Sequence, residues 1–312
     1  MTRYLLADVG GTHTRIAEAA PGGPPGVPVR YLNAGLDGLE SAFGDYLAGS
    51  GGGVDGPLVV AAAVAGPVAA GAVRLTNLGW AVDETGLARS VGAVRARLVN
   101  DYHALARALP ELPPEAMTPV ADRPGMAGAP LAVLGAGTGL GVAGLVPCGG
   151  GWTAVPGEGG HVTLAASDDE EAEVLAVMRR DLGHVSAEAV LSGSGLAALH
   201  RALHGGAAPT PERVTTAANE GDPDAARTLD LFFRFLGMVA GNLALTLGAR
   251  GGVYLAGGIL PALRGPLMAS RFHERFIGKG RFRDYLDAIP VRLINDPEAA
   301  ALWGLRALLD DE

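Results

Sequence analysis

The chain carries the same strand–turn–strand pattern twice. Residues 7–19 and residues 132–145 each run from one apolar strand, through a glycine-threonine turn, into a second apolar strand. Gly11-Thr12 and Gly137-Thr138 occupy equivalent places in the two copies. Self-similarity within a chain is the mark of a repeated structural unit. The pattern therefore predicts an ancient internal duplication, with a pair of strands hinged on glycine in each copy.

Apolar runs alternate with helical patterns around these two segments. The first third predicts strands over residues 3–9, 14–19, 29–34, 57–66, 69–77 and 95–101. It predicts helices over residues 39–49 and 84–90, and a further helix from residue 102. The second half predicts helices over residues 169–181, 195–203, 211–220, 223–247 and 297–308, and strands over 252–256 and 290–294. Prolines in residues 112–130 predict a loop there. A sheet with covering helices, of the α/β class, is the simplest outcome.

The charge and cysteine content exclude several classes of protein. A net charge of −9 with no long basic stretch argues against a nucleic-acid partner. The single cysteine, Cys148, excludes an internal disulfide and fits a reducing compartment. The first residues lack the long apolar segment of a signal peptide. Residues 124–157 are uncharged, but their repeated Gly and Pro favour buried strands and loops over a membrane span. We expect a cytoplasmic protein with no membrane partner.

The first glycine turn, Asp8-Val9-Gly10-Gly11-Thr12-His13, has the composition of a phosphate-binding loop. Backbone amides next to glycine can approach phosphate oxygens closely, and Thr12 adds a donor. Asp8 is placed to hold hydrated Mg²⁺. An ordinary glycine hairpin is the alternative. The segment matches neither the P-loop nor the dinucleotide-binding glycine pattern, so those two nucleotide folds lose support.

Two further glycine turns extend this hypothesis. Gly137 and Thr138 lie at the duplicated position, and two such loops can hold one polyphosphate between them. Gly257 and Gly258 follow an apolar strand, where a turn without side chains lets a flat ring lie against the backbone. The alternative for Gly137 is a hairpin whose glycines serve only packing. The alternative for Gly257 and Gly258 is close packing of a helix against a strand.

Three polar segments are candidates for binding and catalysis. Asp101 can accept a proton from an attacking hydroxyl, with Asn100 beside it, although Asp is also a favoured N-cap for the helix that follows. Glu158 and His161 lie three residues apart in a glycine-rich loop, and they suit the neighbouring hydroxyls of a sugar better than a zinc ion. Glu188 follows Ser186, so it also fits the first turn of a helix capped by that serine.

Together these segments closely resemble the bacterial glucokinase family, within the hexokinase, actin and sugar-kinase fold group. The resemblance covers nearly the whole chain. Its most specific motifs are DVGGTHTR, TNLGWAVD, NDYHALA, GAGTGLGVA, VPGEGGHV, GHVSAEAVLSG, GNLALTLGARGGVYLAGGI and KGRFRDYL.

The resemblance implies a two-lobed actin-like ATPase fold, of the ribonuclease H-like type, with duplicated sheet-plus-helix domains around a cleft. The smaller lobe would comprise residues 1–109 and a C-terminal helix from about 297 to 312, and the larger lobe residues 110–296. The implied reaction is ATP-dependent phosphorylation of glucose with Mg²⁺ by a homodimer. A kinase for mannose or an amino sugar, and a sugar sensor without activity, are the alternatives.

The resemblance also implies a role for each site residue. Asp101 would be the general base, and the sugar hydroxyls would contact Asn100, Asp101, Glu158, His161 and Glu188. ATP would be held by Asp8, Gly10, Gly11, Thr12, His13, Gly137, Thr138, Gly257 and Gly258, with Asp8 binding Mg²⁺ through water. His13 departs from the family, which usually has Asn there, so ATP affinity is expected to depend on pH. The residues Asn295 to Glu298 also depart from the family pattern, and no structural zinc is expected because the chain has only one cysteine.

Overall fold

The computed structural model describes residues 1–49 and 56–312 of the chain. These residues form two compact units, Met1–Pro114 with Asp296–Glu312, and Glu115–Asn295. Residues 110–114 belong to the first unit, whereas the predicted smaller lobe ends at residue 109. The backbone N–H groups of Glu111 and Leu112 donate to the carbonyl of Ala108, the last residue of a helix in this unit. The Glu111 carboxylate also accepts a hydrogen bond from Arg306 at 2.8 Å.

The first unit is a five-stranded sheet covered by helices on both faces. The strands run in the order β3-β2-β1-β4-β7. Their bounds are β1 Arg3–Val9, β2 His13–Ala19, β3 Val29–Leu32, β4 Leu58–Val64 and β7 Arg95–Asn100. A separate hairpin consists of β5 Ala72–Leu75 and β6 Trp80–Asp83. The helices are α1 Leu39–Gly49, α2 Glu84–Val91, α3 Asp101–Ala108 and α11 Pro297–Asp311, with a 3₁₀ turn at Asn33–Gly35.

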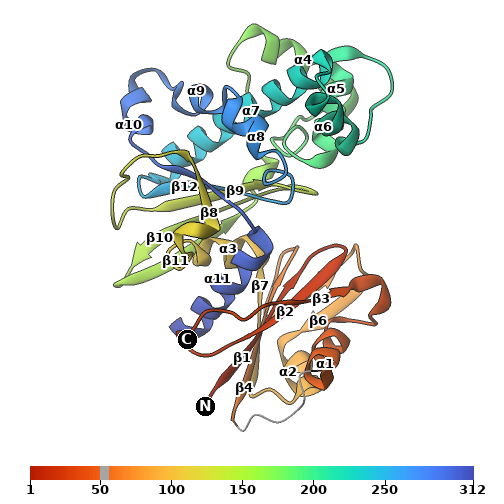
Figure 1. The fold of residues 1–312 in the computed structure, drawn as a ribbon, viewed down its shortest axis with the longest axis vertical. Helices are drawn as coiled ribbons and strands as arrows, with labels where there is room; N and C mark the ends of the chain where they lie inside the picture. Colours follow the sequence, from red (N-terminus) through yellow and green to blue (C-terminus); the bar gives the residue numbers. More distant parts are fainter. Residues whose placement is uncertain (50–55) are drawn as a thin grey trace. The chain divides into compact units, whose positions relative to one another are not determined.

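Strand β1 is buried on both faces, which explains its nearly continuous apolar sequence. Leu5 packs in the cluster that contains Leu39 and Phe43 of α1 and Leu87 of α2. Leu6 packs in a second cluster with residues of α3 and α11, among them Leu305. Figure 1 shows α1 and α2 on one side of this sheet and α3 and α11 on the other. The alternation of side chains along the strand therefore decides which helices each residue meets.

The second unit repeats this plan and adds helices. Its sheet has the order β11-β10-β9-β12-β13-β8, with bounds β8 Met117–Ala121, β9 Leu131–Ala136, β10 Leu140–Cys148, β11 Gly151–Gly157, β12 Gly252–Ala256 and β13 Val291–Ile294. The helices are α4 Asp169–Leu182, α5 Gly193–His204, α6 Pro211–Asn219, α7 Pro223–Leu247, α8 Arg264–Ala269, α9 Phe272–Ile277 and α10 Arg283–Asp287. Short 3₁₀ turns lie at Pro114–Ala116, Gly159–His161 and Gly280–Phe282.

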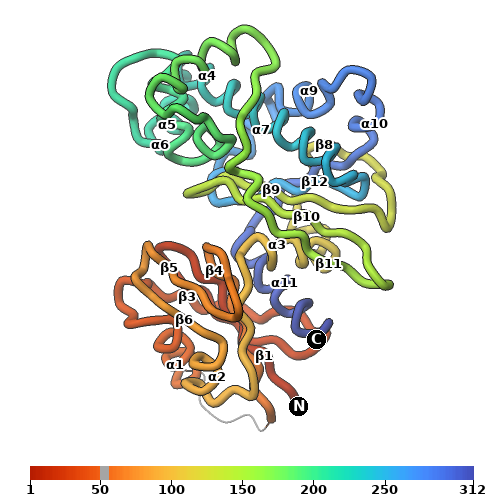
Figure 2. The backbone as a smooth tube through the Cα atoms, turned by 180° about the vertical axis from the view of Figure 1, so that it is seen from behind, coloured from red at the N-terminus to blue at the C-terminus, as the bar shows by residue number. Residues whose placement is uncertain are grey.

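The two sheets share one topology, and this confirms the predicted duplication. In each, three antiparallel strands are followed by strands parallel to the first, so β1, β2, β3, β4 and β7 correspond to β9, β10, β11, β12 and β13. Figure 2 shows the meander β9-β10-β11 from behind. The glycine turn joins the first two strands in both copies.

Helix α7 is the central element of the second unit. Its 25 residues are long and apolar enough to cross a membrane, but 78% of its most apolar window is buried inside the protein. Phe232, Phe233 and Phe235 are among its fully buried side chains, and they belong to one cluster with Leu134 of β9 and Phe276 of α9. Its apolar face therefore packs in the core of this unit.

The prediction of a loop over residues 112–130 is wrong in part, because Met117–Ala121 forms strand β8. This strand contains Pro119 and lies at the edge of the sheet, paired antiparallel with β13. An edge strand tolerates proline, since one side of its backbone has no partner strand to bond. The register also shifts between Val291 and Arg292, opposite this part of β8. Residues 124–157 form strands β9 to β11 and their loops, as predicted.

Candidate functional site

The carboxyl ends of three parallel strands meet at one edge of the first sheet. Val9 of β1 pairs with Val64 of β4, and Val64 pairs with Asn100 of β7. Asp8 lies one residue before the end of β1, and Asp101 directly follows β7. In parallel sheets of this kind, this edge is where ligands bind. The fold thus brings two predicted site carboxylates to the same edge.

Asp8 is a buried carboxylate, and burial raises its pKa to about 8. The charge of Arg15, at 3.6 Å, opposes this rise, while the negative charges of Glu298, Asp101 and Asp296 add to it. Arg15 is shared, because it also forms an ion pair with Glu298. Asp101 is the first residue of α3, and Asp296 caps α11, so the ends of both helices surround Asp8.

The surroundings of Asp8 fit a bound cation. Three further carboxylates act on Asp8, and one arginine is the positive charge that acts against them. A hard divalent ion would relieve this excess of negative charge. Among residues 1–49 and 56–312 no group of three or more His, Cys, Asp or Glu side chains is arranged to hold a metal directly. Mg²⁺ fits such a place, because it usually keeps several waters and shares its other positions with substrate phosphates.

The glycine turn after Asp8 is fastened by Asn33, a residue that the sequence analysis did not single out. Asn33 is buried, its amide nitrogen donates to the Gly10 carbonyl at 2.8 Å, and its oxygen accepts from Thr14 at 2.8 Å. Its backbone N–H donates to the Thr12 carbonyl at 2.9 Å, and Gly10 N–H closes the turn on His13 at 3.0 Å. The sequence carries no local signal for this role, because the predicted strand over residues 29–34 includes Asn33, whereas strand β3 ends at Leu32. We call residues 10–13 the first loop.

His13 is held by Arg30 from the neighbouring strand. An Arg30 Nη2 lies 2.9 Å from His13 Nδ1, and because arginine only donates, Nδ1 accepts and the ring proton is on Nε2. Desolvation, and then the positive charges of Arg30 and Arg15, lower the pKa of His13. The ring is therefore kept neutral and presents one N–H donor, as an asparagine at this position would.

Asn100 is the N-cap of α3, and the alternative that Asp101 is the cap is wrong. The Asn100 oxygen accepts from the backbone N–H groups of Tyr102 at 3.0 Å and His103 at 3.3 Å. Its amide nitrogen donates to the Gly66 carbonyl at 3.2 Å. Asp101 is the first helical residue, and its carboxylate accepts from Tyr102 N–H at 2.9 Å. Asn100 thus fixes the helix start that positions Asp101.

The glycine turn of the second unit, residues 137–139, is fastened at both ends. We call it the second loop. Gly137 N–H closes the turn on the Gly139 carbonyl at 2.8 Å, and Gly193 N–H of α5 donates to the Gly137 carbonyl at 2.9 Å. At the other end, the backbone N–H of Leu140 donates to Glu188 Oε2 at 2.9 Å. Thr138 lies at the tip between these two fastenings.

Glu158, His161 and Glu188 gather beside the second loop. The His161 ring lies 3.9 Å from a carboxylate oxygen of Glu158 on one side and 3.9 Å from Glu188 Oε1 on the other. The Glu158 side chain is 78% exposed and that of His161 62%, whereas that of Glu188 is 34% exposed. Exposed carboxylates and a ring nitrogen at this spacing suit several adjacent hydroxyl groups.

Glu188 lies in a turn, so the alternative that it begins a helix is wrong. Ser186 forms a bridge with Thr163, and its hydroxyl accepts from the Ala189 N–H at 3.2 Å. Glu188 N–H donates to the Gly160 carbonyl at 2.8 Å. These bonds tie the turn to the segment that carries His161.

The third glycine turn packs directly against the second loop. Gly257 has φ +87, in the region that favours glycine, and a Cβ there would collide with the backbone of Ala136 at the end of β9. Ile259 N–H donates to the Ala136 carbonyl at 3.2 Å. Gly258, by contrast, has no atom within 4 Å of the place of a Cβ, so a flat group can lie there.

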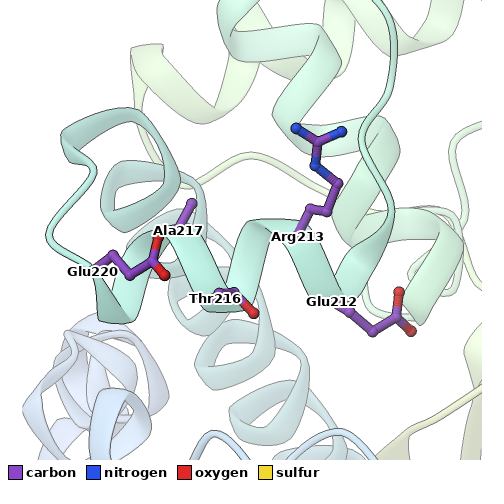
Figure 3. Close-up of a pocket in the computed structure, with 5 residues that line it drawn as sticks. All are labelled: Glu212, Arg213, Thr216, Ala217 and Glu220. Atoms are coloured by element: carbon purple, nitrogen blue, oxygen red, sulfur yellow. The ribbon is translucent and has the colours of Figure 1, made fainter.

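The predicted site residues fall into two sets, one in each unit. Asp8, Gly10, Gly11, Thr12, His13, Asn100 and Asp101 lie in the first unit, and Gly137, Thr138, Glu158, His161, Glu188, Gly257 and Gly258 lie in the second. A cavity of about 290 Å³ runs along α6, lined by Glu212, Arg213, Thr216, Ala217 and Glu220. Figure 3 shows that these side chains lie along α6 and at its C-terminal end, and no predicted site residue is among them.

Comparison with known proteins supports both the fold and the family. The sequence model of the family described as glucokinase matches residues 5–312. A glucokinase of Paramagnetospirillum magneticum is 43% identical over 98% of this chain and 97% of its own length. The crystal structure of a glucokinase from an Antarctic psychrotroph is 33% identical, with a TM-score of 0.88 over 99% of both chains.

A more distant structure shares the fold alone. It is a Streptomyces griseus glucokinase of the ROK family in complex with glucose and AMPPNP, 18% identical, with a TM-score of 0.63 over 98% of both chains. The predicted actin-like α/β fold is confirmed by these structures. The glucokinase family model and a relative of more than 40% identity both match this chain over nearly its full length, so the chain belongs to the glucokinase family.

Proposed function

We propose that this protein transfers the terminal phosphate of ATP to the 6-hydroxyl of D-glucose, forming ADP and D-glucose 6-phosphate. The observation that carries the proposal is the position of Asp101, at the same sheet edge as Asp8, in a chain of the glucokinase family. Phosphoryl transfer needs little covalent chemistry from the protein, so positioned charges and donors account for most of the catalysis.

Asp101 is proposed as the general base. Its carboxylate takes the proton of the 6-hydroxyl while the oxygen attacks the terminal phosphorus and the bond to the leaving ADP breaks. The start of α3 holds the carboxylate in place, because Asn100 caps the helix. A positioned base of this kind contributes roughly 10² to 10⁴ in rate.

The phosphates are proposed to contact the amides of the first and second loops, with Thr12, His13 and Thr138 as further donors. The adenosine is proposed to lie against the turn of Gly257 and Gly258, where the space beside Gly258 is open. Mg²⁺, when bound, would neutralise charge on the phosphate oxygens, and Asp8 would hold it through water. The neutral Nε2–H of His13 is available as a donor, because Arg30 occupies Nδ1.

The sugar is proposed to contact Asn100, Glu158, His161 and Glu188. Among the residues that the structure describes, the Asn100 oxygen accepts two N–H groups and one amide hydrogen donates to Gly66, so its second amide hydrogen is proposed to donate to a sugar hydroxyl. A site that bonds hydroxyl groups rejects sugars that lack them, by up to about four orders of magnitude. A kinase for mannose or an amino sugar is the second candidate, since this residue set contains no group specific for one epimer. Cytoplasmic location and homodimeric assembly stay predictions from the sequence and the resemblance.

A coupled assay for sugar phosphorylation with ATP and Mg²⁺ tests the proposal. Glucose, mannose, fructose and N-acetylglucosamine are compared as acceptors, and Asp101→Ala is the control. We expect glucose to be preferred and the variant to turn over at least about a hundredfold more slowly. Preference for another sugar would support the second candidate. AMPPNP binding without phosphorylation of any sugar would leave a sugar sensor, and near-normal turnover by Asp101→Ala would remove Asp101 from the mechanism.

A further inference from the structure

Glu188 makes two contacts that point to different subsites. Its Oε2 accepts the backbone N–H of Leu140 at 2.9 Å, and its Oε1 lies 3.9 Å from His161 Nδ1. The turn that carries it is tied to the sugar segment through the bond from Glu188 N–H to the Gly160 carbonyl at 2.8 Å. The carboxylate therefore spans from the proposed sugar contacts to the second loop.

The contact with the second loop is close and specific. Leu140 directly follows Gly139, the last residue of the loop, and its N–H is the donor. A Cβ at Gly139 would overlap Glu188 Oε2, so this approach requires the absence of a side chain. Hydrogen bonds to an ionised acceptor are among the stronger ones in proteins. The Glu188 carboxylate is thus an anchor of the loop as well as a candidate sugar ligand.

Glu158 offers a matched comparison within the same subsite. In the part of the chain that the structure describes, the contact recorded for its carboxylate is with His161, at 3.9 Å. Its side chain is more than twice as exposed as that of Glu188, at 78% against 34%. Glu158 can therefore serve the sugar without touching the second loop.

We propose that Glu188 is a positioning residue that couples hexose binding to nucleotide binding, with Oε2 holding the second loop and Oε1 facing the sugar. The inference rests on the proposed function. A sugar hydroxyl bonded to Oε1 fixes the carboxylate, and the fixed carboxylate holds Leu140 N–H and the loop in the conformation that receives phosphate. Each ligand then raises the affinity of the other by the same factor, as thermodynamic linkage requires.

The test is titration of AMPPNP with Mg²⁺, by calorimetry, in the absence and presence of glucose. The proteins are the wild type, Glu188→Ala, Glu188→Gln and Glu158→Ala. In the wild type, we expect glucose to tighten AMPPNP by about fivefold or more. Without sugar, we expect Glu188→Ala to weaken AMPPNP by about tenfold, because Leu140 N–H loses a charged acceptor. Without sugar, Glu188→Gln keeps an oxygen for that N–H and should stay within about threefold of the wild-type Kd for AMPPNP. Glu158→Ala should match the wild-type Kd without sugar, and its loss of a proposed sugar contact should raise the glucose concentration needed to tighten AMPPNP.

The result that would overturn the inference is wild-type AMPPNP affinity, and wild-type glucose dependence, in Glu188→Ala. If that variant does not fold, Glu188→Asp serves instead, since it keeps the charge but withdraws it by one methylene. Hydrogen exchange at the Leu140 amide is a second readout, which should speed up in Glu188→Asp and stay slow in Glu188→Gln. An unchanged rate in Glu188→Asp would also contradict the inference. Failure of the proposed function would show differently, as a wild-type protein that binds AMPPNP but phosphorylates no sugar.

Discussion

The two glycine loops occupy equivalent places in duplicated sheets, yet they are built differently. Val9 and Ala136 end the corresponding strands, so Asp8 in the first copy corresponds to Gly135 in the second. By the same strand ends, Gly10 corresponds to Gly137, which moves the equivalence predicted from sequence, Gly11 with Gly137, by one residue. The first loop is fastened by Asn33, a neutral buried amide that bonds to Gly10, Thr12 and Thr14 of its own unit. The second loop is fastened by Glu188, a charged side chain that also faces His161.

This difference suits the two copies of the hairpin to two tasks. The first copy carries its own carboxylate in the strand, where burial and neighbouring acids suit a cation. The second copy has glycine there and obtains its carboxylate from a distant turn. The Asp8 carboxylate, in the strand before the first loop, is therefore available to a metal. The Glu188 carboxylate connects the second loop to the proposed sugar contacts.

The largest effect should follow from removing the charge of the first copy. Asp8→Asn keeps the size of the side chain but removes the carboxylate proposed to hold Mg²⁺ through water. We expect turnover at saturating glucose and ATP to fall by about a hundredfold or more, equivalent to about 2.7 kcal/mol of transition-state stabilisation. Steady-state kinetics over a range of Mg²⁺ concentrations measures this. Turnover within about threefold of the wild type would show that the first copy has no special role in metal binding.

A second prediction concerns the backbone behind the second loop. Gly257→Ala places a methyl group against the Ala136 backbone at φ +87, whereas Gly258→Ala meets no atom within 4 Å. We expect the first change to lower the free energy of unfolding by about 2–3 kcal/mol and the second by less than about 1 kcal/mol. Denaturant unfolding of both variants measures this. Equal stabilities would mean that the close approach of the third glycine turn does not support the second loop.

The smallest effect should be a pH dependence confined to the first loop. Desolvation, Arg30 and Arg15 lower the pKa of His13, so Arg30→Gln should raise it toward the ordinary value of about 6.5. As pH falls from about 7.5 to 5.5, more of the variant's His13 becomes protonated and attracts phosphate. The ratio of the variant's AMPPNP Kd to that of the wild type should therefore fall by about threefold over this range.

The same substitution in a His13→Asn protein is the control for this prediction. Without a titrating ring the ratio should not change with pH, while the nucleotide's own titration cancels in every ratio. A ratio that falls equally in both backgrounds would assign the pH dependence to another group.

Much of the fold could be predicted from sequence, because apolar residues recur along it at the periods of strands and helices. The duplicated hairpins and the helix from Pro223 to Leu247 appear where they were expected, since buried strands and a long amphipathic helix leave clear apolar patterns. The short helices Arg264–Ala269, Phe272–Ile277 and Arg283–Asp287 were not predicted. Each is too short for a helical period, and none begins with a side-chain cap.

The site was less predictable, because its anchors depend on tertiary contacts. Asp8, Asp101 and the two glycine loops stand out as local motifs. Asn33 does not, because its role depends on a turn about 20 residues earlier in the chain being folded against it. The cap of α3 was misassigned by one residue, since Asn and Asp are both favoured there. The role of Glu188 in holding the second loop could be inferred only from the structure, because its partner Leu140 lies 48 residues away in the sequence.

The most direct test of the difference between the two loops is the dependence of AMPPNP affinity on glucose in Asn33→Ala and Glu188→Ala. Both variants should bind AMPPNP more weakly than the wild type, because each loses a loop anchor. If the account is right, glucose still tightens AMPPNP by the wild-type factor in Asn33→Ala and no longer does so in Glu188→Ala. Loss of the glucose effect in both variants, or its persistence in both, would contradict the claim that only the second loop shares its anchor with the sugar.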